Sequence, residues 1–372
     1  MGSSLKKILA GLAVSVACLY LVLRGVHWEE IPAHLGRVNG GLLALAMLGM
    51  VGAYAFMAWR WHYLLAPLTS GQPPSYPVLF GTMMTGYFFN TFFPARAGDL
   101  MRAHIMSRRT GLRRTTILAT VVIEKLFDGL ALLVWLVAGL PALPLGSGTT
   151  LQFGVIAVVL LAAGFGGLWL VKAQADRLVS LTARVMDLLP VPERLGNLAV
   201  RLVHTFSAGL SVFDRPGPLL KSAGISLLVW LVAAGMFWAA LAAFNLTPAT
   251  PAALLLMTAL VNLGLLIPAM PGNVGNYEAL ILATLVLISP AGSPIDKEIA
   301  VAFALVFHAG QLLATLLVGG LAFWTQRVSM GSLRSDAAEA MAPAPEGAGA
   351  TLRDHMHHPA REEAAELGIE KL

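Results

Sequence analysis

Two arginines flank an interruption in an apolar stretch that covers residues 77–111. The interruption reads FFNTFFPARAGD, and Arg96 and Arg102 lie on either side of Asp99. A guanidinium presents two parallel donors that match the oxygens of a phosphate. The pattern therefore predicts a phosphate site, with Asp99 either holding one arginine in place or capping the helix that follows.

A pair of carboxylates occurs in the next apolar run. Glu124 and Asp128 are four residues apart, so on a helix both side chains lie on one face. Lys125 lies beside them and is a candidate ion-pair partner. Ionisable residues are costly inside a membrane span, which makes this pair a candidate to line a transport route, with a structural ion pair as the alternative.

A second polar group surrounds another interruption, LLIPAMPGNVGN, in the stretch 251–290. Asn276 is expected to cap the helix that returns after this break, with Glu278 in its first turn. His308 and Gln311 are three residues apart on the last apolar run and share a face. We predict that Glu278, His308 and Gln311 contact substrate, with helix capping and local pairing as the alternatives.

Motifs of soluble catalysis are absent from the sequence. It contains no G-x-S-x-G, P-loop, HExxH or Rossmann glycine pattern. Cys18 is the single cysteine, so neither an intrachain disulfide nor a cysteine metal cluster can form. We therefore expect no metal and no cofactor.

Composition indicates which solvent surrounds these residues. The chain has 372 residues, of which 57% are hydrophobic and only 12% charged, whereas soluble domains carry roughly 25% charge. So little charge cannot cover a globular surface in water, which predicts a polytopic all-α integral membrane protein. The net charge of +5 lies between apolar runs, so we assign it to membrane orientation and lipid headgroups and expect no nucleic acid partner.

Hydrophobic length predicts six full spans, because about 20 apolar residues cross a bilayer. These spans are residues 6–25, 41–63, 116–140, 151–171, 219–245 and 299–325. The stretches 77–111 and 251–290 carry proline and glycine in their middle and are expected to be re-entrant hairpins.

The positive-inside rule orients the predicted topology. Six arginines lie between positions 96 and 114, and such a cluster belongs in the cytoplasm. The first hairpin then enters from the cytoplasm and the second from outside. This places both termini in the cytoplasm and the protein in the cytoplasmic (inner) membrane of the cell.

The two interruptions resemble each other in order and position. The first contains Asn90, Pro94, Gly98 and Asp99, and the second contains Asn262, Pro268, Gly272 and Asn273. Each lies between two spans, and the hairpins enter from opposite faces, so we predict an inverted repeat. Paired Gly/Pro breaks in inverted halves indicate a transporter binding site, where freed amides and helix N-termini bind an anion.

Two other segments differ in composition from the spans. Residues 172–218 mix arginine with leucine and valine at helical spacing, which predicts cytoplasmic amphipathic helices. Residues 328–372 are rich in Ala, Pro, Gly and Glu and are expected to form a disordered cytoplasmic tail. The remaining chain, residues 1–327, is predicted to be one transmembrane domain.

Three segments together resemble a known family. GYFFNTFFPARAGDLMRAHIM, TVVIEKLFDGLALL and IPAMPGNVGNYEALIL are similar to the flippase-like transmembrane domain of lysylphosphatidylglycerol synthase and its stand-alone relatives, over roughly residues 6–327. The resemblance implies movement of lipids, or lipid-linked groups, between leaflets. The positions that match the family pattern are Asn90, Pro94, Arg96, Gly98, Asp99, Arg102, Glu124, Asp128, Pro271, Gly272, Gly275 and Glu278. Lys125 stands where the family often has arginine.

The leading prediction is a lipid translocase that binds an anionic phospholipid or a polyprenyl phosphate. The hairpins would meet near the mid-plane and form a polar groove for the headgroup. One alternative is an integral membrane transferase or hydrolase that acts on a lipid-linked substrate, with Glu124 and Asp128 as its catalytic residues. Another is a secondary transporter of a small anion. Gly310 and the pair at 319–320 permit close helix packing, within one chain or in a homo-oligomer.

Overall fold

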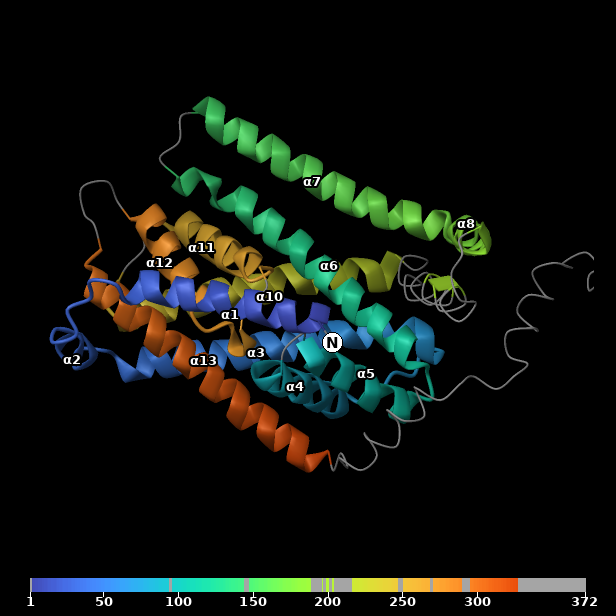
Figure 1. Cartoon of the computed structure of the whole chain (residues 1–372), viewed down its shortest axis with the longest axis horizontal. Helices are drawn as coiled ribbons and strands as arrows, with labels where there is room; N and C mark the ends of the chain where they lie inside the picture. The colour runs from blue at the N-terminus through green and yellow to red at the C-terminus, as the bar shows by residue number, and fades with distance from the viewer. Residues whose placement is uncertain are drawn as a thin grey trace, which may run out of the picture.

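A computed structural model describes residues 2–93, 96–143, 147–188, 216–246, 250–267, 270–289 and 295–326, with four further positions between 189 and 215. The described part is all helical (Figure 1). Its α-helices are α1 (Gly2–Leu23), α2 (Ile31–Leu35), α3 (Gly40–Leu65), α4 (Tyr76–Phe92), α5 (Ala97–Thr110), α6 (Arg114–Gly139), α7 (Ser147–Ala173), α8 (Ala175–Leu188), α10 (Pro216–Ala243), α11 (Pro251–Gly264), α12 (Asn276–Ile288) and α13 (Lys297–Thr325). Short 3-10 turns are η1 (Ala66–Thr69), η3 (Leu140–Ala142) and η5 (Pro271–Asn273).

Each predicted span coincides with one long helix: α1, α3, α6, α7, α10 and α13. Three helical segments of the described chain are both long and apolar enough to cross a membrane, namely Gly40–Thr69, Pro216–Ala243 and Lys297–Thr325. Local signals set several starts, because the side chains of Asn39, Thr250 and Asp296 accept hydrogen bonds from the first turns of α3, α11 and α13.

The helices beside the two breaks are short. α4 and α5 have 17 and 14 residues, and α11 and α12 have 14 and 13. At 1.5 Å per residue, each covers only about 20–25 Å. A single one of these helices is therefore too short to cross a hydrocarbon core of about 30 Å.

The long and short helices pack in a reciprocal pattern. α3 lies along α10, α6 packs on α11, and α13 packs on α4 (Figure 1). Each long helix that follows one break thus contacts the first short helix of the other break. Glycines allow this closeness: a Cβ on Gly319 would lie 2.7 Å from the Met84 carbonyl oxygen, and one on Gly139 2.6 Å from the Leu256 backbone nitrogen. Gly319 therefore packs within the chain.

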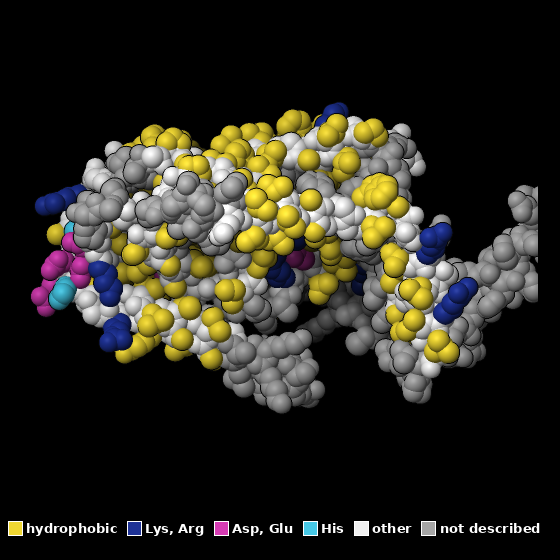
Figure 2. Space-filling model, turned by 90° about the horizontal axis from the view of Figure 1, so that it is seen from above, with side chains coloured by type: hydrophobic (Ala, Val, Ile, Leu, Met, Phe, Trp, Pro, Cys, Tyr) yellow, Lys and Arg dark blue, Asp and Glu magenta, His cyan; other side chains and the backbone are white. Residues whose placement is uncertain are grey.

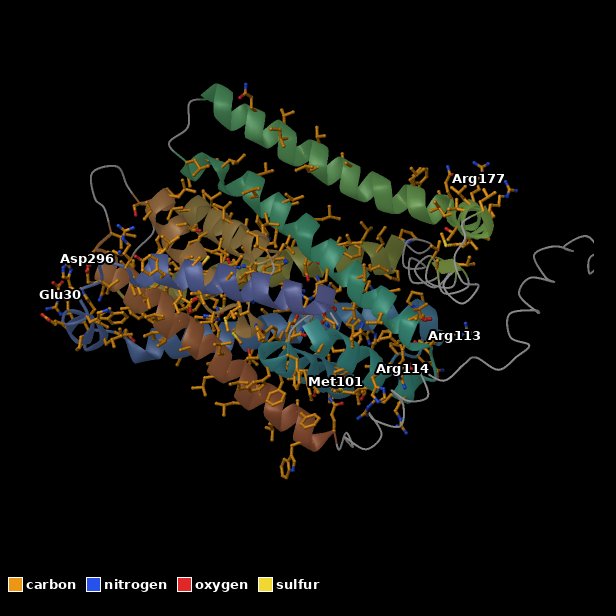
Figure 3. The ribbon with its side chains drawn as sticks, viewed as in Figure 1. Glu30, Met101, Arg113, Arg114, Arg177 and Asp296 are labelled. Atoms are coloured by element: carbon orange, nitrogen blue, oxygen red, sulfur yellow. The ribbon has the colours of Figure 1, made fainter. Side chains whose placement is uncertain are left out.

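Charged side chains concentrate at the two ends of the long axis. Figure 3 places Glu30 and Asp296 at one end and Arg113, Arg114 and Arg177 at the other. On the face drawn in Figure 2, hydrophobic side chains cover most of the length between these ends. Large apolar side chains are exposed along α7 and α13, among them Trp169 and Leu317.

The two remaining predicted segments are described only in part. α8 confirms a helix at the start of residues 172–218, although most of 189–215 lies outside the described residues. The predicted tail, 328–372, also lies outside them.

Candidate functional site

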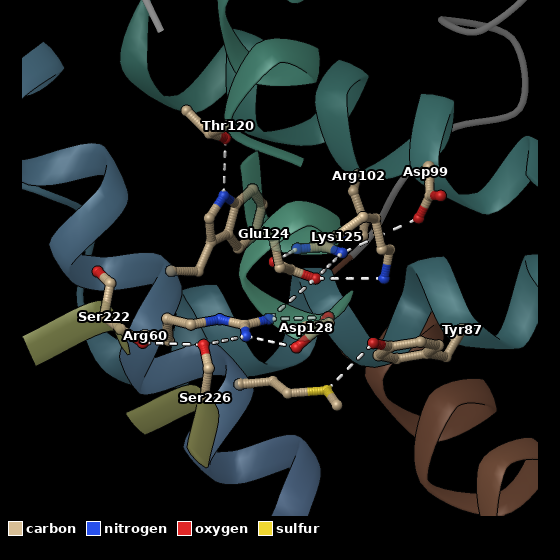
Figure 4. A network of polar contacts seen from close by, with 12 residues as sticks. Arg60, Tyr87, Asp99, Arg102, Thr120, Glu124, Lys125, Asp128, Ser222 and Ser226 are labelled. Atoms are coloured by element: carbon tan, nitrogen blue, oxygen red, sulfur yellow. Dashed lines mark hydrogen bonds and ion pairs between the residues drawn. The ribbon is translucent and has the colours of Figure 1, made fainter. Parts of the chain in front are cut away.

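Arg60 of α3 joins three helices inside the bundle (Figure 4). Its NH1 donates to Asp128 Oδ1 at 2.5 Å and to Ser226 Oγ of α10 at 2.7 Å, and its NH2 donates to Asp128 Oδ2 at 3.2 Å. NH2 also lies 3.7 Å from Glu124 Oε1. Glu124 and Asp128 therefore share a helix face, as their spacing predicted, and both contact one arginine.

Arg102 of α5 contacts the opposite side of Glu124. Its NH1 and NH2 donate to the two carboxylate oxygens at 3.2 and 2.9 Å, a bidentate pair. The guanidinium lies 4.4 Å from the ring centroid of Trp61, whose Nε1 donates to Thr120 Oγ1 at 3.0 Å. Arg102 is only 1% exposed, so its guanidinium is enclosed by the surrounding helices and by its ion pair with Glu124.

The completed cluster is balanced in charge. Asp99 lies 3.9 Å from Arg102, and Lys125 Nζ lies 3.4 Å from Glu124 Oε1. The cluster's cations are Arg60, Arg102 and Lys125, and its carboxylates are Asp99, Glu124 and Asp128. Removing a charge from water costs several kcal/mol unless it is paired, which explains why each buried charge has a partner. We call these six residues the ion network.

The first break lies directly beside the ion network. The Gly98 N–H donates to Asn90 Oδ1 at 2.8 Å, and Asn90 Nδ2 donates to Asp99 Oδ1 at 3.4 Å, which closes the ends of α4 and α5. Arg96 precedes α5 with a left-handed φ of 54° and an exposed side chain. No hydrogen bond or ion pair joins Arg96 to another described residue. Pro94 lies outside the described residues.

At the second break, a glycine takes the helix-capping position for which an asparagine side chain was predicted. Gly272 and Gly275 adopt φ values of 73° and 87°, which favour glycine. Gly275, and not Asn276 as predicted, is the N-cap of α12, and its N–H donates to Glu278 Oε2 at 2.7 Å. Pro271 begins the η5 turn between the short helices.

A histidine of α13 contacts the other oxygen of Glu278. His308 Nδ1 lies 2.7 Å from Glu278 Oε1, and both side chains are buried. The Tyr277 ring packs on the imidazole with centroids 4.5 Å apart. Gln311, one turn along α13, contacts Met236 Sδ through Nε2 at 3.9 Å. The structure thus brings the predicted residues Glu278, His308 and Gln311 together near the start of α12.

Asn262 differs from its predicted counterpart Asn90. Its Nδ2 donates to the Thr258 carbonyl of its own helix at 2.8 Å, so it does not close the second break. At the second break a serine of α1 binds the backbone instead, because the Met270 N–H donates to Ser15 Oγ at 2.9 Å. α1 is therefore part of the second break, which the sequence pattern did not reveal.

The two breaks are neighbours in space. η5 packs on α4, and a Cβ on Gly272 would lie 3.6 Å from the Thr91 carbonyl oxygen. Lys125 Nζ lies 5.7 Å from the ring centroid of Tyr87, which stacks on Tyr54 at 4.5 Å. Aromatic side chains with polar tips thus extend from the ion network into the centre of the bundle.

Sequence reasoning missed three residues of this site: Arg60, Trp61 and Ser226. Arg60 and Trp61 look like the polar end of a span, and Ser226 like one small residue in a helix. The available signal was that an arginine adjoining an apolar run needs a carboxylate, for which Asp99, Glu124 and Asp128 were the candidates in the following apolar stretches.

Two other polar places lie away from the ion network. Glu30, His34 and Asp296 could approach one ion, but Asp296 already caps α13 by accepting from the Glu298 and Ile299 N–H groups. An open pocket of about 610 Å³ lies between the η1 region and the end of α5, with Arg109 in its wall.

Residues 8–319 match the family described as the lysylphosphatidylglycerol synthase TM region. The chain belongs to this family. The match and the long apolar helices together make it a multi-pass membrane protein, as composition predicted.

Two curated proteins are similar to this chain, each with 25% sequence identity. The chain is 25% identical over 362 residues to glycosyltransferase AglD of Haloferax volcanii, in a match covering 89% of this chain and 56% of that protein. It is 25% identical over 301 residues to a UPF0104 membrane protein of Methanothermobacter thermautotrophicus, covering 75% and 84% respectively. The chain therefore spans little more than half the length of the first relative.

Proposed function

We propose that this protein binds an anionic lipid headgroup at the first break and moves it between leaflets. The observation that carries the proposal is the ion network: six ionisable side chains lie beside a helix break in a protein that spans a membrane. Ionisable groups at membrane depth usually serve transport or catalysis.

The proposed topology has six spans and two re-entrant hairpins in an inverted repeat. The short helices beside each break and the reciprocal packing of α6 on α11 and α13 on α4 support it. The basic end with Arg113, Arg114 and Arg177 would face the cytoplasm. Both termini would then be cytoplasmic in the inner membrane.

Lys125 and Arg96 are the cations best placed to receive a phosphate first. The Lys125 side chain is 32% exposed, and Arg96 is exposed in a strained left-handed conformation, which occurs often at ligand sites. Basic and acidic side chains are also visible in the middle of the face in Figure 2, away from both ends.

Unused hydrogen-bond donors lie within the ion network and on Ser222 beside it. The Nε atoms of Arg60 and Arg102, and Ser222 Oγ, are buried with no hydrogen-bond partner among the described residues. Buried donors are normally satisfied, so a phosphate oxygen or water is expected there. In the proposed step, the headgroup contacts Lys125 and then accepts from these donors while Glu124 keeps both guanidiniums in place.

Native mass spectrometry of the gently solubilised protein tests headgroup binding. Wild type should retain an anionic phospholipid or polyprenyl phosphate, and Arg96→Ala/Lys125→Ala should lose it. Arg113→Ala/Arg177→Ala is the matched control, because it removes two cations far from the break. Equal retention by both double variants would show that the headgroup does not bind at the first break.

A second candidate function is glycosyl transfer to a lipid-linked acceptor, favoured by the name of the Haloferax relative. Glu124 and Asp128 would then act on substrate at the same network. Product formed from a polyprenyl phosphate and a sugar nucleotide, and lost in Asp128→Asn, would favour this reading over lipid movement.

A further inference from the structure

The Glu278–His308 pair differs from the ion network in one chemical respect: its charge can change by one proton. With a shared proton, either as His⁺ with a carboxylate or as neutral imidazole with a carboxylic acid, the pair has net charge zero. Without that proton, neutral imidazole and carboxylate leave a net charge of −1. Guanidinium–carboxylate pairs resist such a change near neutral pH, because arginine stays protonated and favours the ionised form of its carboxylate partner.

The surroundings of the pair provide no other ionic partner among the described residues. On α12, the Gly275 N–H binds Glu278, and Tyr277 packs on His308. Of the helices packed against α12 and α13, α3 and α4 bring the phenols of Tyr54 and Tyr87, and α10 brings an apolar face. The sequence of α11 contains no ionisable residue, and α2, which packs against α13, carries His34.

α1 adds no charge near the pair in its described part. Ser15 binds the backbone at Met270, and Cys18 is the titratable group within one turn of it. The buried pair therefore depends on its own proton for neutrality.

Asn276 provides a second, independent sign of a polar ligand here. Its side chain is 4% exposed, and its Nδ2 has no partner among the described residues. A buried donor without a partner costs about 1–3 kcal/mol, so a water molecule or headgroup oxygen is expected beside the pair.

We propose that Glu278 and His308 form the proton-binding site that couples lipid movement to a proton gradient, with one proton crossing in the same direction as each monoanionic headgroup. This inference rests on the proposed function and adds its energy source. The deprotonated pair repels an anion at the neighbouring break, whereas the protonated pair does not. Proton and headgroup therefore favour each other's binding, which is a reciprocal coupling.

The proton balance of the cycle is simple. On the side of higher proton activity, a proton binds between His308 Nδ1 and Glu278 Oε1. The loaded state carries one headgroup charge of −1 and one added proton of +1. After the change of access, headgroup and proton leave together and the pair returns to −1. No bond other than those to the proton forms or breaks.

Phosphatidylglycerol with a fluorescent acyl chain, in phosphatidylcholine vesicles with an imposed pH difference, tests the coupling. For one proton per headgroup, its ratio between leaflets should shift about tenfold per pH unit at steady state. An internal pH dye should report proton entry in step. Glu278→Gln keeps an acceptor for the Gly275 N–H but cannot titrate, and should abolish the response to the gradient. Glu298→Gln is the control, because it removes a carboxylate at the start of α13, ten residues before His308.

The outcomes separate this inference from the proposed function. A gradient response in wild type and Glu298→Gln that is lost in Glu278→Gln supports the inference. Lipid movement indifferent to the gradient overturns the inference and leaves lipid translocation standing. No lipid movement in wild type overturns both. If Glu278→Gln fails to fold, His308→Gln replaces it, and an unchanged gradient response in that variant overturns the inference.

Discussion

The two breaks share an order of elements but not a chemistry. At the first, between α4 and α5, six charged side chains form a network with no net charge and four guanidinium–carboxylate contacts. At the second, before α12, one carboxylate is held by one histidine and one backbone N–H. Arginines favour the ionised carboxylates of the first site near neutral pH, whereas the second site pairs its carboxylate with histidine, whose charge changes most readily in that range. In our proposal, the first break therefore binds the anionic headgroup and the second break binds and releases a proton.

The strongest way to break this comparison is to open the ion network. Arg60→Met leaves Asp128 buried without its bidentate partner, which should cost about 3–5 kcal/mol of unfolding free energy. Arg60→Met/Asp128→Leu removes both charges and should cost clearly less than the sum of the single changes. Thermal or denaturant unfolding in detergent measures both variants. Additive losses would show that the pair is not coupled.

Neutralising one carboxylate at each break sharpens the contrast. Glu124→Gln leaves three cations facing two carboxylates and should cost about 3 kcal/mol. Glu278→Gln keeps its hydrogen bonds in a neutral form and should cost about 1 kcal/mol. The same unfolding assay compares them directly. Equal losses would contradict this contrast between the two sites.

The seams between paired short helices offer a smaller contrast. A Cβ on Gly98 would lie 1.8 Å from the Gly86 carbonyl oxygen, whereas one on Gly264 meets the Leu280 side chain at 2.4 Å. Backbone cannot yield as a leucine rotamer can, so Gly98→Ala should cost about 1–3 kcal/mol and Gly264→Ala less. The midpoints of thermal unfolding report the difference. If Gly264→Ala is the more damaging, the α4–α5 seam is not the tighter one.

A His–Glu pair whose imidazole is exposed provides a reference for the fully buried one. Glu298 hydrogen-bonds His27 at 2.9 Å and raises the pKa of the imidazole above its usual 6.5. A raised folded pKa contributes stability that is complete below pH 6.5 and is lost as pH rises through the raised value. We expect a small fall in the unfolding midpoint across that window in wild type. His27→Gln should remove the fall, and its persistence would assign it to another group.

Sequence patterns anticipated the helices and the breaks because those depend on local properties. Apolar length fixes the six long helices, and proline with glycine interrupts the two others. The shared face of Glu124 and Asp128 follows from helical spacing alone. The bounds of α3, α6 and α13 agree with the predicted spans within a few residues.

The partners across the bundle could not be read from the sequence. Arg60 and Asp128 are 68 positions apart, and nothing local says that Arg102 binds Glu124 and not a ligand. The expected mirror between Asn90 and Asn262 also failed to extend to their contacts, because α1 supplies Ser15 to the second break. Contacts between distant segments depend on tertiary packing, which a single sequence does not encode by spacing.

Lipid movement itself is the claim on which the rest depends, and a leaflet-exchange assay without a gradient measures it directly. Phosphatidylglycerol with a fluorescent headgroup-proximal acyl label is placed in both leaflets of protein-containing vesicles, and an impermeant reductant bleaches the outer leaflet. The account predicts that wild type exposes inner-leaflet probe to bleaching, and that Arg96→Ala/Lys125→Ala slows this while Arg113→Ala/Arg177→Ala does not. If vesicles with wild-type protein protect the inner leaflet as protein-free vesicles do, this protein does not translocate phosphatidylglycerol.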